Sequence, residues 1–489
     1  MSVSRLARIA ALVLAFSPVL IAQQPTPTAP ASPQAPQYLL PPKALIDLID
    51  ADPIPQALAS PNHQTLALLA RHANPTIADL SRPMLRLAGV RVNPRNNGPF
   101  RVTPVYALSF KKMADGAETK VTTPAGGTIG AVGFSPDGKS FAFTVTTDRT
   151  IALWVANTAT GAARAIPEVT VNGLSVSGFG GAPCEWLADS ASLVCRTVPA
   201  MRGAAPVEPA VPTGPNVQEN HAAPAPVRTY EDMLTNAHDE ALFDYYFTSQ
   251  LTVIEVATGK KTAIGKPAIF ESADLSPNGE FVLVTRITRP YSYLVPATDF
   301  PAEEEVWNRK GETVKHLAGR PMADTVPIGG VLTGPRRLAW QPSAPAALSW
   351  VEALDGGNPK TKAEFRDRAL SLAAPFTDVP TELMKVAGRI GMLGYTERGT
   401  LMLSESDRAT RTTRTWLIDQ PGGAPRKLWD RKQQDAYNNP GTPLSRGRGR
   451  GLIQHGDWIY LQGEGASPQG DRPFLDRLNL KTLAIERLF

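Results

Sequence analysis

A short turn motif recurs along the chain and constrains its fold more than any other feature. The clearest copy occupies residues 132–143, with the sequence V-G-F-S-P-D-G-K-S-F-A-F. Proline presets the backbone of a tight turn, aspartate suits the next position, and glycine adopts the left-handed conformation that follows. Apolar residues flank the turn on both sides, as they do in two antiparallel strands joined by a short connection. The motif therefore predicts a β-hairpin.

Further copies of this hairpin, some of them weaker, bring the number to seven; they start near Ser60, Trp186, Leu275, Trp340, Tyr395 and His455. A second hairpin follows each copy, so each unit supplies four antiparallel strands. The units recur at roughly 50 to 65 residues, a spacing typical of β-propeller blades. We therefore predict an all-β fold over residues 43–489: a β-propeller of about seven four-stranded antiparallel blades. Separate β-sandwiches are the alternative, but they would require linkers between domain-sized blocks.

Composition agrees with a fold made of short strands and many turns. The 489 residues include 46 Pro and 39 Gly, which disfavours long helices, while a 42% share of hydrophobic residues is too high for general disorder. Part of the proline excess lies in a low-complexity segment, 200–227, which we expect to be an insertion loop. The net charge of +5 is too small to indicate a nucleic-acid-binding protein.

The N-terminus has the pattern of an export signal. Arg5 and Arg8 precede an apolar run that ends at Ala22, and polar residues follow. We predict a signal peptide over 1–22, a proline-rich linker over 23–42, and an exported protein that is periplasmic or secreted. No other stretch is long enough to span a membrane, so we expect no span after signal cleavage. An uncleaved N-terminal anchor is the alternative.

The chain has only two cysteines, Cys184 and Cys195. The residues between them are predicted to form a hairpin that places Cys184 opposite Cys195. In an oxidising compartment this arrangement allows a disulfide, and two reduced buried thiols are the alternative.

No catalytic, metal or cofactor motif occurs in the sequence. No serine lies in G-x-S-x-G, the six histidines are scattered singly, and there is no phosphate-binding glycine loop. We therefore expect no catalytic residue, no metal site and no cofactor within this chain.

Specific sequence blocks resemble a known family. These are F-D-Y-Y at 243–246, R-P-Y-S-Y at 289–293 and G-E-G-A-S-P-Q-G at 463–470. Over residues 41–489 the chain resembles the propeller of glutamyl endopeptidase-type members of the prolyl oligopeptidase family. The resemblance implies a serine peptidase with two domains: an N-terminal propeller that admits peptides, and a C-terminal α/β-hydrolase that carries a Ser-Asp-His triad. None of the triad residues can be placed on this sequence.

Two functions are therefore considered. In the first, the chain is a fragment: the substrate-gating and incomplete propeller of an exported serine peptidase that hydrolyses peptide bonds, with cleavage after Glu as one option. Its hydrolase domain is missing, it is inactive alone, and it meets peptide substrates through that missing domain. Arg286 and Arg289 are its substrate-binding candidates, because a cation favours acidic peptides. In the alternative, the chain is a stand-alone periplasmic propeller that binds or scaffolds other molecules without catalysis.

Overall fold

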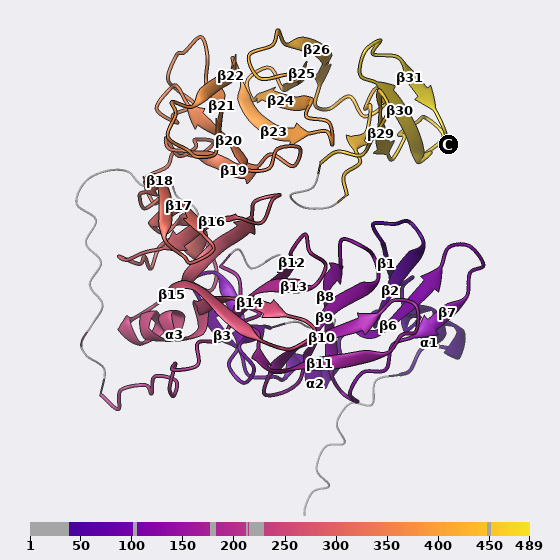
Figure 1. Ribbon diagram of the computed structural model, residues 1–489, viewed down its shortest axis with the longest axis vertical. Coiled ribbons are helices and arrows are strands. Elements are labelled where there is room, and N and C mark those ends of the chain that lie inside the picture. Colours follow the sequence, from indigo (N-terminus) through magenta and orange to yellow (C-terminus); the bar gives the residue numbers. More distant parts are fainter. Residues whose placement is uncertain (1–38, 101–104, 177–181, 212–213, 215–228, 447–450) are drawn as a thin grey trace, which may run out of the picture. The chain divides into compact units, whose positions relative to one another are not determined.

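The computed structural model describes residues 39–100, 105–176, 182–211, 214, 229–446 and 451–489 (Figure 1). The chain separates into two units, Met1–Ile49 and Asp50–Phe489. In the first unit the structure describes a single helix, α1 (Lys43–Ile49), which has no buried residue. The predicted signal peptide, most of the predicted linker and most of segment 200–227 lie outside the described residues. Among those that are described, no helix is both long and apolar enough to cross a bilayer.

The second unit consists of seven consecutive groups of antiparallel strands, here called blades 1 to 7, which follow one another from indigo to yellow in Figure 1. Blade 1 contains β1 (Gln56–Ala59), β2 (Thr65–Arg71), β6 (Val105–Lys112) and β7 (Glu118–Lys120). Blade 2 contains β8 (Thr128–Phe134), β9 (Ser140–Thr146), β10 (Ile151–Asn157) and β11 (Ala163–Thr170). Blade 3 contains β12 (Cys184–Trp186), β13 (Ser192–Thr197), β14 (Thr248–Glu255) and the first part of β15 (Lys261–Leu275).

The remaining blades repeat the pattern. Blade 4 contains the rest of β15, β16 (Phe281–Ile287), β17 (Ala302–Asn308) and β18 (Thr313–Arg320). Blade 5 contains β19 (Arg336–Trp340), β20 (Ala347–Ala353), β21 (Asp367–Ala373) and β22 (Thr381–Val386). Blade 6 contains β23 (Arg389–Tyr395), β24 (Leu401–Asp407), β25 (Thr412–Ile418) and β26 (Arg426–Lys432). Blade 7 contains β27 (Thr442–Pro443), β28 (Gln454–His455), β29 (Trp458–Gly463), β30 (Phe474–Asn479) and β31 (Ile485–Arg487).

Three irregularities leave this pattern intact. One residue pair, Val105 and Ile129, links β6 of blade 1 to β8 of blade 2. The long strand β15 pairs with β14 up to Ile269 and with β16 from Phe270 onward, so one strand ends blade 3 and begins blade 4. In blade 7, β27 and β28 pair with opposite ends of β29 and together take the place of one strand. The prediction of an all-β propeller with about seven four-stranded antiparallel blades is confirmed.

Local chemistry at the first turn of several blades explains why the motif recurs. In blade 2 the buried Ser135 donates to the carboxylate of Asp137 (2.6 Å), and Gly138 has a φ of +74°. This hydrogen bond is the largest contribution that holds the pKa of Asp137 below its ordinary value. Blades 1 and 4 repeat the serine contact with asparagine, because Asn62 and Asn278 accept from the preceding serine at 2.7 Å. In these three blades a serine and an aspartate or asparagine therefore hold the turn together.

The hydrophobic core is divided into clusters that lie between consecutive blades. Separate clusters join blades 1 and 2, 2 and 3, 3 and 4, 4 and 5, 5 and 6, and 6 and 7. Two tryptophans reinforce these interfaces from equivalent positions: Trp186 donates to Gly133 O (2.9 Å) and Trp340 donates to Asp274 O (2.8 Å). Each tryptophan thereby binds the first strand of the preceding blade. At one blade interface Cys184 and Cys195, paired between β12 and β13, form a disulfide.

Several elements were not foreseen in the sequence. Between β2 and β6 lie the short helix α2 (Ile77–Leu80) and a separate sheet of β3 (Leu85–Leu87), β4 (Val90–Asn93) and β5 (Gly98–Pro99). One inserted element does agree with the sequence: the acidic segment 230–246 is typical of a short helix or an acidic loop, and α3 (Ala237–Phe247) lies there, between β13 and β14. Between β16 and β17 lies a 3-10 turn, Ala297–Asp299.

Candidate functional site

The two faces of the propeller differ in what they carry. Because neighbouring strands in a blade run in opposite directions, the connection between its second and third strands lies on the same face as the link to the next blade. The other two connections of each blade lie on the opposite face. We call these the insertion face and the turn face. The long connections 72–104, 198–247 and 288–301 all belong to the insertion face.

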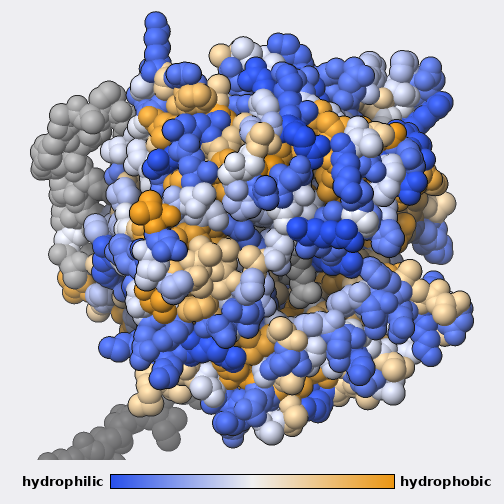
Figure 2. Space-filling view, turned by 45° about the horizontal axis from the view of Figure 1, so that its top comes forward, coloured by the Kyte–Doolittle hydropathy of each residue, from blue (hydrophilic) through white to orange (hydrophobic). Residues whose placement is uncertain are grey.

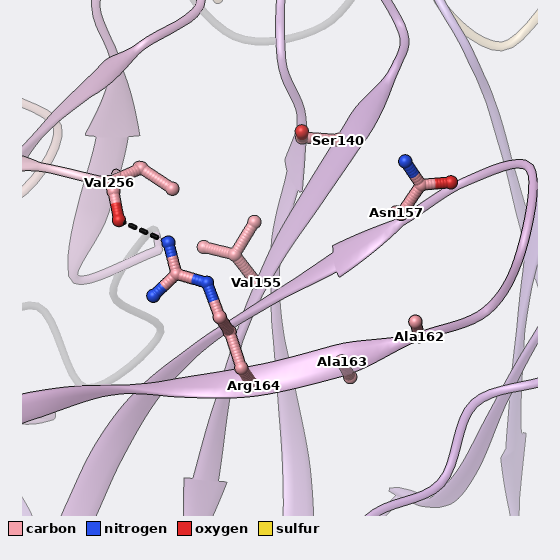
Figure 3. Close-up of a pocket in the computed structure, with 7 residues that line it drawn as sticks. All are labelled: Ser140, Val155, Asn157, Ala162, Ala163, Arg164 and Val256. Atoms are coloured by element: carbon pink, nitrogen blue, oxygen red, sulfur yellow. Dashed lines mark hydrogen bonds between the residues drawn. The ribbon is translucent and has the colours of Figure 1, made fainter. Parts of the chain in front are cut away.

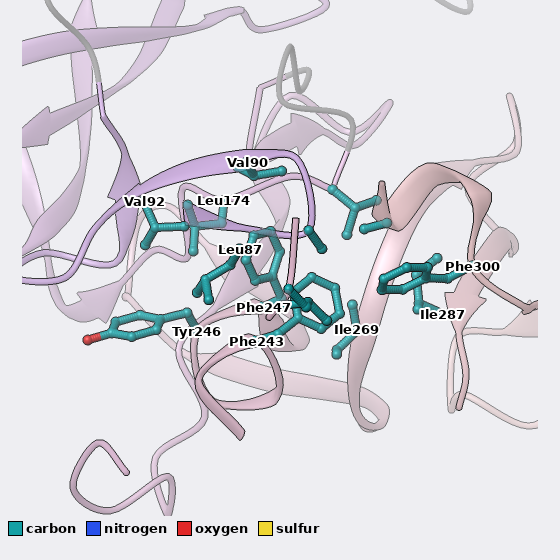
Figure 4. Packing of buried hydrophobic residues seen from close by; sticks show 14 of the residues in the cluster. Leu87, Val90, Val92, Leu174, Phe243, Tyr246, Phe247, Ile269, Ile287 and Phe300 are labelled. Atoms are coloured by element: carbon teal, nitrogen blue, oxygen red, sulfur yellow. The ribbon is translucent and has the colours of Figure 1, made fainter. Parts of the chain in front are cut away.

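These connections pack together into a cap with its own hydrophobic core, shown in Figure 4. The core is built around Phe243 on α3 and Phe300 after the 3-10 turn, and neither side chain is exposed. Their ring centroids are 5.8 Å apart in an edge-to-face arrangement. Leu87 and Val92, from the three-stranded sheet, complete the core from blade 1. Segments distant in sequence are therefore joined into one structure.

Two buried asparagines fix the cap to the blades. Asn97 donates to the side chain of Asn172 (2.7 Å), and Asn172 in turn donates to Tyr246 O (2.9 Å) and to Ser249 Oγ (2.9 Å). Asn172 has no exposed surface. Since a buried amide that loses its partners costs free energy, this network specifies how α3 enters blade 3.

A polar group borders the cap core. Arg289 forms ion pairs with Glu240 and with Asp244 (2.6 Å) and stacks on the ring of Tyr291. The Tyr291 hydroxyl donates to Asp244, and the Tyr293 hydroxyl donates to Glu240 (2.8 Å). Burial first, and then the hydrogen bond to Glu240, raise the pKa of Tyr293 to about 12. Two carboxylates surround one guanidinium, so the group carries a net negative charge.

The second arginine candidate, Arg286, is also engaged within the protein. Its Nε lies 2.9 Å from the carboxylate of Glu305, and its guanidinium lies over the ring of Trp307. Burial of Glu305 opposes its charged form, but hydrogen bonds from Arg286 and Trp307 hold its pKa below the ordinary value. Both arginines are thus already paired with carboxylates of the protein itself.

A buried carboxylate with incomplete pairing lies in blade 4. Glu304 is 5% exposed, and burial raises its pKa to about 7. Within the described residues, neither Glu304 Oε2 nor Arg320 Nε has a hydrogen-bond partner, although Arg320 forms an ion pair with Glu271. Nothing in the sequence distinguishes this group, because strand β17 reads as A-E-E-E-V-W-N and all three glutamates look equivalent.

Two shallow cavities lie among the described residues. One of about 400 Å³ is lined by Arg95, Asp148 and Arg149 on the insertion face. The other, of about 260 Å³, lies where blade 2 meets blade 3; there Arg164 donates to Val256 O and closes one side (Figure 3). Neither contains the serine, histidine and carboxylate that acyl transfer requires.

Exposed hydrophobic side chains gather on the insertion face. Those on its connections or strand ends are Ile54, Ile77, Leu80, Tyr106, Met201, Val207, Val211, Leu294, Ile328, Leu354, Phe365 and Tyr437. On connections or strand ends of the turn face, the exposed large hydrophobics are Met113, Val314, Val379 and Ile485. Figure 2 shows hydrophobic patches within a largely hydrophilic surface. Grouped exposed apolar side chains indicate a contact surface.

Comparison with curated proteins finds relatives over nearly the whole chain. The chain is 36% identical over 481 residues to a probable glutamyl endopeptidase, chloroplastic, from rice (Oryza sativa subsp. japonica). It is 35% identical over 482 residues to the protein of the same name from Arabidopsis thaliana. Each match covers 92% of this chain.

Over the matched region the chain is a sequence relative of the prolyl oligopeptidase family. It is similar to the glutamyl endopeptidase-type members of that family, and it spans about half the length of the curated relatives it matches, 50% of the rice protein and 49% of the Arabidopsis protein. No protein-family model matches the sequence.

Two solved peptidase structures resemble the chain at low identity. A prolyl endopeptidase is 12% identical with a TM-score of 0.46, and the similarity covers 90% of this chain and 50% of that one. The β-propeller domain of the Trilobed protease from Pyrococcus furiosus is 8% identical with a TM-score of 0.40, over 90% of this chain and 95% of that one.

Within the described residues, the structure does not bring a serine, a histidine and a carboxylate together as a catalytic group. Among the described histidines, the side-chain partners are Asp52 for His72 (3.2 Å), Glu303 for His316 (2.7 Å) and Arg446 for His63 (3.1 Å), and none is a serine. No group of three or more His, Cys, Asp or Glu residues in these ranges could hold a metal ion.

Proposed function

We propose that this chain is the substrate-admitting propeller of a serine peptidase, and that its insertion face docks a catalytic α/β-hydrolase domain that lies outside the chain. The proposal is carried by one observation: the inserted connections and most of the exposed hydrophobic side chains of the propeller lie on the same face. The relatives support it, because they are named glutamyl endopeptidases and are about twice as long as the match.

In this role the propeller contributes geometry rather than chemistry. A docked domain would cover exposed side chains such as Ile77 (86% exposed) and Leu294 (58% exposed) and would gain the hydrophobic free energy of their burial. The cap has a buried aromatic core and is hydrogen-bonded to the blades through Asn97 and Asn172, so it presents a preformed surface. A substrate would have to pass the propeller to reach the covered catalytic site, and folded proteins would be excluded by size.

Binding in trans tests the docking surface. The purified chain is mixed with the part of the rice relative that lies outside the matched region, and complex formation is measured by isothermal titration calorimetry. The variant Ile77→Asp/Leu294→Asp changes the insertion face, and Met113→Asp/Val379→Asp changes the turn face by the same charge. We expect the first variant to weaken binding at least about tenfold, since each charge would be buried unpaired, and the second to bind as the parent does.

Equal binding by both variants would refute docking through the insertion face. Absence of any complex with the parent chain would favour the alternative, a stand-alone propeller that binds other molecules.

We also propose that the protein is exported. The support is the N-terminal order of two arginines, an apolar run and a small residue at Ala22. Expression in a bacterial host followed by N-terminal sequencing tests this proposal: a mature protein in the periplasm should begin at Gln23, whereas a cytoplasmic protein that retains Met1 would contradict it.

A further inference from the structure

Blade 6 carries a group of cations that the rest of the protein does not neutralise. The group consists of Arg408 and Arg411 in the β24–β25 connection and Arg431 and Lys432 at the end of β26; we call it the cation patch. The strands place these residues at one end of blade 6, because Thr412 pairs with Lys432 and Thr413 pairs with Arg431. Lys432 Nζ also donates to Thr410 O (3.2 Å). Arg408, Arg411 and Lys432 are exposed.

The carboxylates of the same blade are placed so that they leave the patch charged. Asp430 pairs with Arg414 (3.1 Å) and Lys427 (3.5 Å), and Asp419 pairs with Arg426 (2.9 Å). These pairs lie along β25 and β26 or at the β25–β26 turn. Within the described residues, no carboxylate lies within ion-pair distance of any of the four patch cations.

The two acids nearest in sequence are committed to turns. The carboxylate of Asp407 accepts hydrogen bonds from Ala409 N (2.8 Å) and Thr410 N (3.3 Å). The carboxylate of Asp435 accepts hydrogen bonds from Asn438 at both of its oxygens. These bonds lower the pKa of Asp435, and the charge of Arg431 adds a smaller contribution. Like charges gathered at one end of a blade repel one another, so an anionic partner would relieve a cost that the ion pairs of the described residues do not relieve.

The patch lies on the insertion face. The β24–β25 connection joins the second and third strands of its blade, and β26 ends on the same side. The guanidinium of Arg408 also reaches the connection between blades 4 and 5, where it lies against Gly329. The patch therefore shares its face with the cap and with the exposed hydrophobic side chains.

We propose that the cation patch binds acidic segments of peptide substrates at a distance from the cleaved bond and draws them to the insertion face. The proposal rests on the proposed function, in which substrates enter at that face. It assigns the recognition of acidic peptides to Arg408, Arg411, Arg431 and Lys432, and not to Arg286 and Arg289, which are already paired with carboxylates. Charge complementarity is the physical basis, so binding should weaken as salt screens it.

The test uses the purified full chain and a fluorescein-labelled oligoglutamate peptide, with binding read by fluorescence anisotropy at about 50 and about 300 mM NaCl. The variant Arg408→Gln/Arg411→Gln/Lys432→Gln removes three patch charges. The matched control, Lys139→Gln/Lys310→Gln/Arg398→Gln, removes three exposed charges from the turn face. We expect about a tenfold loss of affinity in the patch variant at low salt, little change in the control, and weaker binding of the parent at high salt.

Three results would overturn the proposal. The first is equal affinity of the patch and control variants for oligoglutamate, and the second is binding of an oligoglutamine peptide as tight as that of oligoglutamate. The third is equally tight binding of a single-stranded oligonucleotide of the same net charge, which would indicate a general polyanion surface. If the triple variant does not fold, the single variant Arg411→Gln is compared with Arg398→Gln in the same assay. No catalytic domain is present in this assay, so its outcome is independent of whether docking occurs.

Discussion

The substitution Phe243→Ala would test whether the cap is a packed structure in its own right. Phe243 has no exposed surface, and its ring lies 4.5 Å from that of Phe247, 5.1 Å from that of Tyr291 and 5.8 Å from that of Phe300. Truncation removes the ring and leaves a cavity whose walls come from separate connections. Such a site collapses poorly, so we expect the upper part of the usual range for a buried phenylalanine, about 4 kcal/mol.

The expected loss has a particular form. Because the cluster lies outside the interfaces between blades, the cap should open before the blades unfold. We predict that limited proteolysis of Phe243→Ala cuts first within 198–247 and 288–301, while hydrogen exchange of the cap amides shows the lower free energy of opening. The control is Phe365→Ala, whose side chain is 38% exposed and which should cost less than about 1 kcal/mol. A Phe243→Ala variant as stable as this control, with an unchanged cleavage pattern, would refute the account of the cap.

Three further predictions concern the blades. Burial raises the pKa of Glu304 to about 7 from an ordinary value near 4.5, so the folded state binds more protons than the unfolded state between these pH values. The free energy of unfolding should therefore fall as pH rises from 4.5 to 7 and then level off. Glu304→Gln should remove this part of the pH dependence of urea unfolding. Gly357→Ala should cost more than Gly356→Ala in thermal unfolding, since both glycines have positive φ but only at Gly357 would a Cβ meet a backbone carbonyl, at 2.0 Å. Replacing Cys184 and Cys195 by serine should lower the free energy of unfolding by about 2 to 3 kcal/mol, because the disulfide closes a short loop, and peptide mapping without reductant should show the two cysteines linked.

Each of these predictions has its own contrary outcome. If the free energy of unfolding depends on pH in the same way with and without Glu304, the pKa of this carboxylate does not differ between the folded and unfolded states. Equal costs at Gly356 and Gly357 would mean that strain from positive φ, and not the close backbone contact, limits both sites. Alkylation of Cys184 and Cys195 in the folded, unreduced protein would show free thiols.

The repeat could be predicted from the sequence because its signals are local. The serine and the aspartate or asparagine of one tight turn make their hydrogen bonds within five residues, as at Ser135 and Asp137. The proline between them presets the backbone of the same turn. The pairing of Cys184 with Cys195 follows from the same short-range hairpin geometry. Such features survive in any fold that contains the hairpin.

The cap and the cation patch could not be predicted for the opposite reason. Phe243 and Phe300 are 57 positions apart in the printed sequence and come together only because three insertions share one face. The charge of Arg289 suggested a free cation, but α3 places Glu240 and Asp244 against it. Whether a cation is neutralised depends on such long-range contacts, which sequence spacing does not contain.

Reconstituted peptidase activity is the most direct test of the central claim that this chain controls access and supplies no catalytic group. The purified chain is assayed with a short glutamate-containing peptide, alone and together with the part of the rice relative outside the matched region, and each sample is treated with a fluorophosphonate probe. We predict no turnover and no labelling of the chain alone. The mixture should cleave the peptide but not the same sequence held within a folded protein. Labelling of the isolated chain, or cleavage of the folded protein by the mixture at the rate of the free peptide, would contradict the account.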